Sequence, residues 1–241
     1  MSITADRRKR EFQQREELIL AAAREMFEKV GFLNLKMADL ARAVEYSTGT
    51  LYQHFASKED LLLAMSAQIH AEVMPVLERI AATFRTSRDR ITAFCLGHAE
   101  VTRRDPESFR IWQFAIAHSV WMRASEDRRE AVERLDDRGR RSLQSIVDDA
   151  VATGDLDPRC GSVGEIGLSL FSFLLGTYTV TNEAKPSRMF RIEDAYELLR
   201  RNLALYLDTI RWQPVGADAD AVYQRVCHEL DAAQIGGANH A

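Results

Sequence analysis

The stretch Met37–Phe55, MADLARAVEYSTGTLYQHF, limits what this chain can fold into more than any other feature. Its first half carries apolar residues at intervals of three and four, the spacing of one helix face, at Met37, Leu40, Ala41 and Val44. Ser47 can cap the start of a second helix, on which Leu51 and Phe55 would point inward together. The stretch therefore predicts two short helices, over Met37–Val44 and from Ser47, joined by a tight turn.

The second helix would turn a polar face outward. Thr48 and Gly49 are small enough for the backbone to approach DNA, and the Gln53 amide can bond an adenine edge. Tyr52 and His54 offer polar tips that suit phosphate oxygens. This is the composition of a helix that reads the major groove in a helix-turn-helix. The same spacing also fits an αα corner whose polar residues touch nothing, and it leaves both interpretations open.

Residues 18–58 resemble the amino-terminal domain of the tetracycline-repressor (TetR) family of bacterial regulators. The matching segments, in the family's order and spacing, are ILAAA (19–23), MF (26–27), GF (31–32), MADLA (37–41), STGTLYQHF (47–55) and SKEDLL (57–62). The resemblance implies an all-helical, dimeric, DNA-binding regulator, usually a repressor that a small ligand releases from its operator. It supplies only an expectation of architecture for the rest of the chain.

The positions that the resemblance and the spacing assign to DNA contact lie in and around the two short helices. They are Lys36, Thr48, Gly49, Thr50, Tyr52, Gln53, His54 and Lys58. Lys36 and Lys58 also fit plain surface lysines, although Lys58 matches a phosphate-contacting lysine of similar proteins.

Two places depart from the family pattern. Glu45 stands where the family usually has Gly, and a left-handed backbone there would cost a Glu about 1–2 kcal/mol. Leu35 and Lys36 replace the hydroxyl residues that commonly cap the second helix, and Asn34 is the nearest substitute cap.

Charge and cysteine content fit a cytoplasmic DNA-binding protein. The whole chain has a net charge of −4, but residues 1–58 hold ten Lys and Arg against eight Asp and Glu, so the acidic excess lies in the remainder. Three widely spaced cysteines, Cys95, Cys160 and Cys227, suit a reducing compartment. We expect no secretory signal at the charged start and no run of membrane-spanning length.

The sequence predicts four segments. These are a basic arm (1–14), the helix-turn-helix domain (15–58), a helical ligand-binding and dimerisation domain (59–212), and a tail with a short helix (213–241). The basic run Arg7–Arg10 fits a flexible arm that follows DNA phosphates or the minor groove, or else a solvated, disordered terminus.

Apolar periodicity and breaker residues predict the remaining helices. The first would run over 15–30 with Leu18, Ala22, Phe27 and Val30 near one face, and Gly31 would end it. The others are expected over 57–84, where Pro75 stops or kinks the helix, and over 87–104, 106–124, 126–153, 163–180, 192–210 and 218–232, with a frayed end from Gly236.

The family expectation is a homodimer through the helices at 163–180 and 192–210, bound to a double-stranded, near-palindromic operator. An effector pocket is expected in the middle of the chain. Its candidate lining residues mix aromatic surface with polar tips, which favours a lipophilic or aromatic effector, and they are Cys95, His98, Trp112, His118 and Trp121. Each of these also fits an ordinary core position.

The sequence leaves functions of other classes open. Cys95 and His98 could begin a metal site, but with only His118 as a further candidate ligand we expect no metal and no cofactor. We expect no enzyme, since the sequence has no phosphate-cradling glycine loop, no His-Glu-x-x-His and no nucleophile elbow. A dimeric ligand-binding or protein-binding module with a vestigial head is also possible, as is a transcriptional activator of the same fold.

Overall fold

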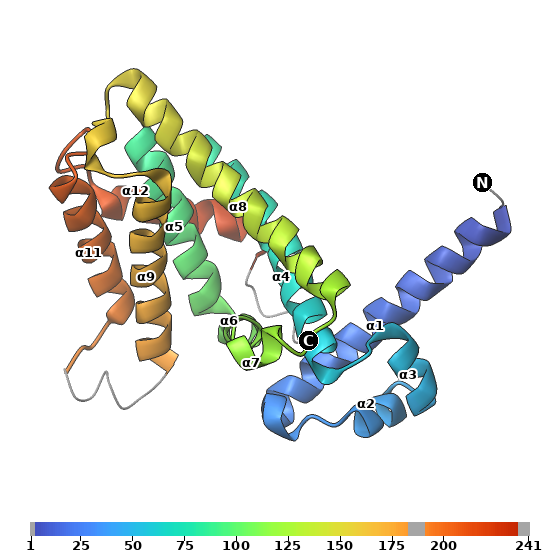
Figure 1. Cartoon of the computed structure of the whole chain (residues 1–241). Coiled ribbons are helices and arrows are strands. Elements are labelled where there is room, and N and C mark those ends of the chain that lie inside the picture. The colour runs from blue at the N-terminus through green and yellow to red at the C-terminus, as the bar shows by residue number, and fades with distance from the viewer. Residues whose placement is uncertain (1–2, 183–190, 236–241) are drawn as a thin grey trace. The chain divides into compact units, whose positions relative to one another are not determined.

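The computed structural model describes residues 3–182 and 191–235, and every regular element in these two ranges is a helix (Figure 1). The expected all-α fold class is therefore confirmed. The chain forms two compact units. The first contains the chain up to His70 together with Arg110–Leu135, and the second contains Ala71–Phe109 and the described residues from Asp136 onward.

The first unit contains a small three-helix head and the elements that pack on it. Its helices are α1 (Ile3–Asn34), α2 (Met37–Ala43), α3 (Thr48–His54), the start of α4 (Lys58–Ala82), most of α6 (Pro106–Ala115), α7 (His118–Trp121) and the start of α8 (Glu126–Thr153). Figure 1 shows α2 and α3 side by side beneath α1.

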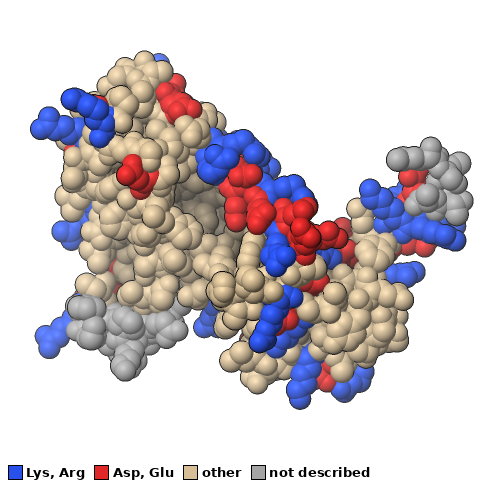
Figure 2. Space-filling model, in the orientation of Figure 1, with Lys and Arg blue, Asp and Glu red and all other residues tan. Residues whose placement is uncertain are grey.

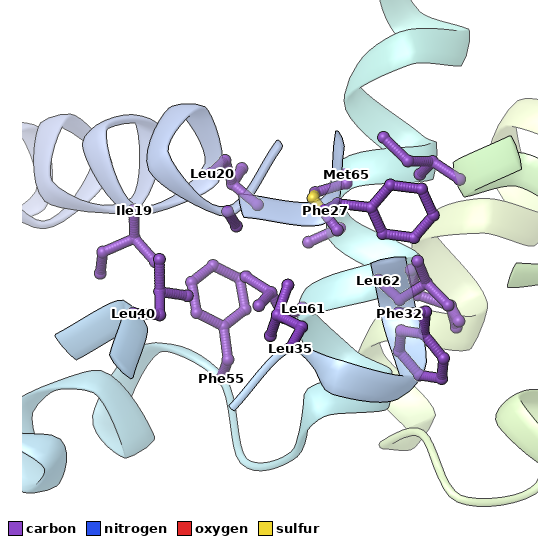
Figure 3. Packing of buried hydrophobic residues seen from close by; sticks show 14 of the residues in the cluster. Ile19, Leu20, Phe27, Phe32, Leu35, Leu40, Phe55, Leu61, Leu62 and Met65 are labelled. Atoms are coloured by element: carbon purple, nitrogen blue, oxygen red, sulfur yellow. The ribbon is translucent and has the colours of Figure 1, made fainter. Parts of the chain in front are cut away.

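The core of the first unit includes one stripe of α1. Ile19 and Ala23 have no exposed surface and Phe27 is nearly as buried. Figure 3 shows Leu40 of α2, Phe55 just after α3 and Leu61 of α4 in the same core. The buried face is displaced by one residue from the expected one, because Leu18 is 60% exposed and Val30 43% exposed. Phe27 is buried as expected. Gly31, at φ 71°, breaks the helix as expected.

The basic segment is helical in this structure. α1 begins at Ile3, so Arg7–Arg10 lie on a helix that continues into the head, and neither a flexible arm nor a disordered terminus describes residues 3–14. Residues 1 and 2 lie outside the described range. The side chain of Arg7 pairs with Glu11 one turn later at 2.8 Å, in the i,i+4 arrangement that supports an exposed helix.

The second unit is built around α5 (Ser87–Arg104), which carries apolar residues on several faces. Its other elements are the later part of α4, the rest of α8, a short 3-10 turn (Pro158–Cys160), α9 (Val163–Asn182), α11 (Ala195–Thr209) and α12 (Ala219–Ala232). α12 packs along α5 through Val222, Val226 and Leu230. The end that we expected to fray from Gly236 lies outside the described residues.

Apart from α1, several helix bounds match the sequence expectation and two differ. α4 runs unbroken from Lys58 to Ala82, close to the expected range, so Pro75 does not stop the helix. The helix expected over 106–124 is two helices, because Ala117 adopts an extended conformation between α6 and α7. α11 starts at Ala195 and not at Ile192, since the Asp194 carboxylate accepts hydrogen bonds from the backbone N–H groups of Tyr196 and Glu197 and caps the helix there.

α9 and α11 lie next to each other and leave an apolar face uncovered in a single chain. Leu168 is 67% and Leu205 61% exposed, and Phe171 and Leu198 are also exposed. Figure 2 shows few charged side chains over α9. Contrary to the expectation that no run is long enough, Val163–Thr181 has the length and composition of a membrane span, although the core helix of a soluble protein passes the same test.

Candidate nucleic-acid interface

α3 starts where its capping residue predicted. Ser47 has an extended backbone, and its Oγ accepts a hydrogen bond from the Thr50 backbone N–H at 3.0 Å. The Thr50 side chain is half-buried, with its hydroxyl 2.8 Å from the Ser47 hydroxyl. Leu51 and Phe55 have no exposed surface and fix the helix against the core, as the spacing predicted.

The opposite side of α3 is open to solvent. Thr48, Gly49, Tyr52 and Gln53 are all exposed, and we call these four residues the reading face. Tyr52 retains 49% of its surface, which is high for a large aromatic ring. The reading face therefore presents one amide, two hydroxyls and a bare stretch of backbone, which are groups that can bond base edges and phosphates.

In the turn before α3, the residue that stands where the family usually has glycine adopts a left-handed backbone conformation. Glu45 has φ 57°. The Tyr46 backbone N–H donates to the Ala41 carbonyl at 2.9 Å, and the Glu45 N–H donates to the Arg42 carbonyl at 3.2 Å. This is the pattern of a helix that ends in a left-handed residue, and here a Glu occupies the position that favours Gly.

The two lysines at helix starts differ in their surroundings. Lys36 is exposed and occupies the cap position of α2, so its ammonium group is accessible. Asn34 does not cap α2, since its side-chain amide donates to the Val30 carbonyl. Lys58 is half-buried, and its Nζ donates to the Phe32 carbonyl at 2.8 Å while lying 4.4 Å from the centre of the Phe32 ring. Any phosphate contact by Lys58 has to compete with these bonds.

His54 is not a surface residue, and its expected role in contacting phosphate is wrong for this structure. Its side chain is buried and stacks on the Phe12 ring with 4.0 Å between ring centres. Its Nδ1 has no hydrogen-bond partner. Burial lowers the pKa of His54, with the nearby charges of Glu16, Arg15 and Arg128 as smaller influences. A buried, neutral ring here contributes packing at the end of α3.

The sequence analysis missed the partners of that ring. Phe12 comes from α1, and Arg128 of α8 reaches the same end of α3, where it donates to the His54 carbonyl at 3.1 Å. Arg8 and Arg15 stand one turn before and after Phe12 on α1, so they share its side of the helix. No local pattern connects these residues with α3, because they are remote in the sequence.

The five candidate effector residues are divided between the two units. Cys95 and His98 belong to the second unit, and Trp112, His118 and Trp121 belong to the first. Cys95 is buried, and burial raises the pKa of its thiol to about 12, which leaves it protonated and a poor metal ligand. His98 Nδ1 lies 3.0 Å from the hydroxyl of the buried Tyr178.

The three candidate effector residues of the first unit differ in exposure: Trp112 and Trp121 are half-buried, and His118 is exposed.

Within residues 3–182 and 191–235, no cluster of three or more His, Cys, Asp or Glu could hold a metal ion. The second unit has a shallow hollow of about 350 Å³ between the end of α8 and the start of α9, lined partly by Val147, Val151 and Val163. None of the five candidates lines this hollow.

Comparison with known proteins identifies the domain that contains the reading face. Residues 19–65 match the model of "Bacterial regulatory proteins, tetR family". Residues 19–65, which include the reading face, therefore form a TetR-family domain. The chain is 42% identical over 67 residues to the HTH-type transcriptional regulator UidR of Escherichia coli. That match covers 28% of this chain and 31% of UidR, so the chain matches only about a third of the length of its curated relatives.

Solved structures extend the TetR-family likeness in fold to most of the chain. A TetR-family regulator from Pectobacterium atrosepticum has a TM-score of 0.61 at 24% identity, and the match covers 85% of this chain and 97% of that one. FadR from Bacillus subtilis, solved with stearoyl-CoA, has a TM-score of 0.59 at 16% identity over 78% of this chain and 95% of its own. The ketosteroid regulator KstR2 of Mycobacterium tuberculosis has a TM-score of 0.57 at 19% identity, covering 82% and 95%.

Proposed function

We propose that this TetR-family transcriptional regulator is a repressor that binds a near-palindromic operator as a homodimer and leaves it when a small lipophilic or aromatic effector binds. The observation that carries the proposal is the reading face, an exposed polar side of a capped helix whose other side is fixed by Leu51 and Phe55. Such a helix fits the major groove. Its place of action would be the cytoplasm, where the DNA is.

Each residue of the reading face has a distinct role in this proposal. Gln53 bonds an adenine edge, the Thr48 methyl meets a thymine methyl, and Gly49 lets the backbone approach. Tyr52 and the exposed Lys36 bond phosphate oxygens. Thr50 acts mainly through its bond to Ser47, and Lys58 contacts a phosphate only if it leaves the Phe32 carbonyl.

The basic start of α1 adds phosphate contacts. Arg8 and Arg15 lie on the side of α1 that meets α3 through Phe12, so their charges are held beside the end of the reading helix. Each phosphate neutralised on duplex DNA steepens the dependence of log affinity on log salt by about 0.9. We expect the double variant Arg8→Ala with Arg15→Ala to flatten that slope while the preferred sequence stays the same.

Dimer formation is supported by the uncovered apolar face of α9 and α11. Leu205→Glu should place a charge in that interface and give a monomer by sedimentation equilibrium. Met122→Glu is the matched control, since Met122 is equally exposed at 61% but lies in the first unit. A dimer that survives Leu205→Glu unchanged would refute this interface.

Two structural neighbours and the side chains of the second unit support the effector class. Two structural neighbours are a regulator solved with stearoyl-CoA and a ketosteroid regulator, and both names point to bulky lipophilic molecules. The second unit of this chain is rich in apolar and aromatic side chains, among them Tyr178 and Phe109, whose ring centres lie 4.7 Å apart. Long-chain acyl and steroid compounds are therefore the first classes to screen for loss of DNA binding.

Mobility shift with the genomic fragment beside the protein's own gene tests DNA binding. The double variant Tyr52→Ala with Gln53→Ala should lose specific binding while the dimer persists. Gln224→Ala, an exposed glutamine of α12 in the second unit, should bind like the wild type. The proposal fails if the wild-type protein does not retard the fragment at low salt, or if the double variant retards it as well as the wild type does.

A further inference from the structure

Arg128 lies in the first turn of α8, and its guanidinium contacts the carboxyl end of α3. Its Nη2 donates to Glu16 Oε1 of α1 at 2.5 Å and to the His54 carbonyl at 3.1 Å. Its guanidinium carbon also lies 5.0 Å from the centre of the Phe55 ring. All four residues belong to the first unit, so one cation of α8 links α1 to the carboxyl end of α3.

The position of Arg128 matters because α3 depends on neighbouring residues for its orientation. A helix of seven residues is too short to be stable alone, and its last carbonyls lack partners within the helix. Arg128 supplies a donor to one of those carbonyls and a positive charge at the negative end of the helix dipole. Phe12 covers the His54 ring one turn of α1 before Glu16, so the end of α3 is held on two sides.

The backbone at the start of α8, which carries Arg128, is itself held in place. The Ser125 backbone N–H, just before α8, donates to Asp60 Oδ1 at 2.7 Å, and the Asp60 side chain is buried. The Asp60 backbone N–H in turn donates to Ser57 Oγ at the start of α4. The first turn of α8 is thereby tied to the first turn of α4, and Arg128 projects from a backbone that has a defined place in the head.

We propose that Arg128 is a positioning residue for DNA recognition. It holds the carboxyl end of α3 at the angle at which the reading face meets base edges, and it does so without touching DNA, because its side chain is only 25% exposed and is engaged by Glu16. The proposal rests on the proposed function for its consequence at DNA. It extends the recognition machinery to α8, a helix that no helix-turn-helix pattern includes.

The variants are Arg128→Ala, Arg128→Lys and the control Arg134→Ala. Arg134 lies on the same helix and in the same unit, but it is 68% exposed and pairs only at the surface with Glu130, at 3.4 Å. The duplex is the one that the wild-type protein selects from a random library, with a scrambled duplex of equal length as the non-specific probe. Circular dichroism and size exclusion establish whether each variant is folded. If Arg128→Ala does not fold, Arg128→Lys provides the test.

We expect Arg128→Ala to reduce the ratio of specific to non-specific affinity by about tenfold, the factor that one charge-assisted hydrogen bond is worth. Arg128→Lys should fall between it and the wild type, because one ammonium group cannot reproduce all three contacts. The salt slope of specific binding should stay unchanged. A slope flattened by about 0.9 would mean that Arg128 itself neutralises a phosphate, and it would overturn the proposal.

Hydrogen exchange without DNA separates this inference from the proposed function. Arg128→Ala should speed exchange of the backbone amides of residues 51–56, and Arg134→Ala should not. If the two variants exchange alike, Arg128 does not hold α3 and the inference is wrong, whatever the protein binds. If exchange speeds up but the wild type selects no sequence, the proposed function fails while the positioning of α3 by Arg128 stands.

Discussion

Replacing Glu45 with Gly tests the backbone strain in the turn between α2 and α3. Glu45 is exposed, has φ 57°, and directly follows Val44, the residue that caps the end of α2. A side chain with a Cβ in this left-handed region costs about 1–2 kcal/mol relative to the right-handed region, and glycine avoids that cost. The Tyr46 N–H bond to the Ala41 carbonyl requires this conformation, so Glu45 cannot relax without the loss of that bond.

Two smaller effects set the net change. Glycine gives the unfolded chain more conformational freedom, which lowers the free energy of unfolding by about 0.5–1 kcal/mol. Removing a carboxylate from the negative end of the α2 dipole raises the free energy of unfolding by about 0.3 kcal/mol, since a negative charge is unfavourable there. We therefore expect Glu45→Gly to raise the free energy of unfolding by about 0.5–1 kcal/mol, and the melting temperature by about 1–4 °C for a chain of this size.

Chemical and thermal denaturation of three proteins separates strain from charge. Glu45→Gln removes the negative charge but keeps the Cβ, so we expect it to gain only the small electrostatic part. Glu45→Gly should exceed it by the strain that is relieved. If the two variants are equally stable, charge and not backbone strain explains the gain, and a less stable Glu45→Gly would mean that the turn tolerates a side chain without strain.

Three further predictions concern stability. Burial lowers the pKa of His70 to about 4, against 6.5 unfolded, so the unfolded chain binds an extra proton between those values. The free energy of unfolding should fall by up to about 3 kcal/mol from pH 7 to pH 4, and His70→Gln should remove that part of the pH dependence in denaturant titrations. Tyr223→Phe removes the 2.8 Å hydrogen bond to the buried Glu100 carboxylate and should cost about 1.5–3 kcal/mol in the same assay. Gly97→Val should cost about 1–3 kcal/mol, measured by melting temperature, because a Cβ there lies 2.9 Å from Leu77 Cδ2 in a closed core.

The helix bounds that the sequence predicted correctly are those with chemical signals at their ends. The helix over 87–104 starts after Thr86, whose Oγ1 accepts from the Asp89 N–H, and ends before Asp105 and Pro106. The helix over 126–153 ends at Gly154, which has φ 80°. The break at Ala117 carries no such signal, because the residues around it are ordinary helix formers, and it was missed for that reason.

The buried face of α1 was ambiguous because too many of its positions are apolar. Leu18, Ile19 and Leu20 are consecutive, so more than one stripe at helical spacing passes through this segment. Packing against α2 to α4 selected the stripe through Ile19 and Ala23. Periodicity identifies a helix, but with apolar residues on neighbouring stripes it does not identify which one is buried.

His54 shows where the prediction of the candidate site ended. The exposure of Tyr52 and Gln53 follows from the helical period once Leu51 and Phe55 are inward, so it could be predicted locally. By the same period His54 lies at the border between the buried and the exposed side of the helix. It is buried because Phe12 packs on it, and Phe12 lies far away in the sequence, on a helical extension that was expected to be an arm. Only the tertiary fold decides between a phosphate contact and a packed ring.

The same reasoning applies to specificity. A seven-residue helix derives its direction from the residues that pack around it, and at its carboxyl end these come from α1 and α8, outside the two helices of the motif. An error of direction moves every group on the reading face at once, whereas losing one side chain removes one contact. Substitutions at Phe12 or Arg128 should therefore lower discrimination between DNA sequences at several base positions together, while a change at Gln53 should relax discrimination at one.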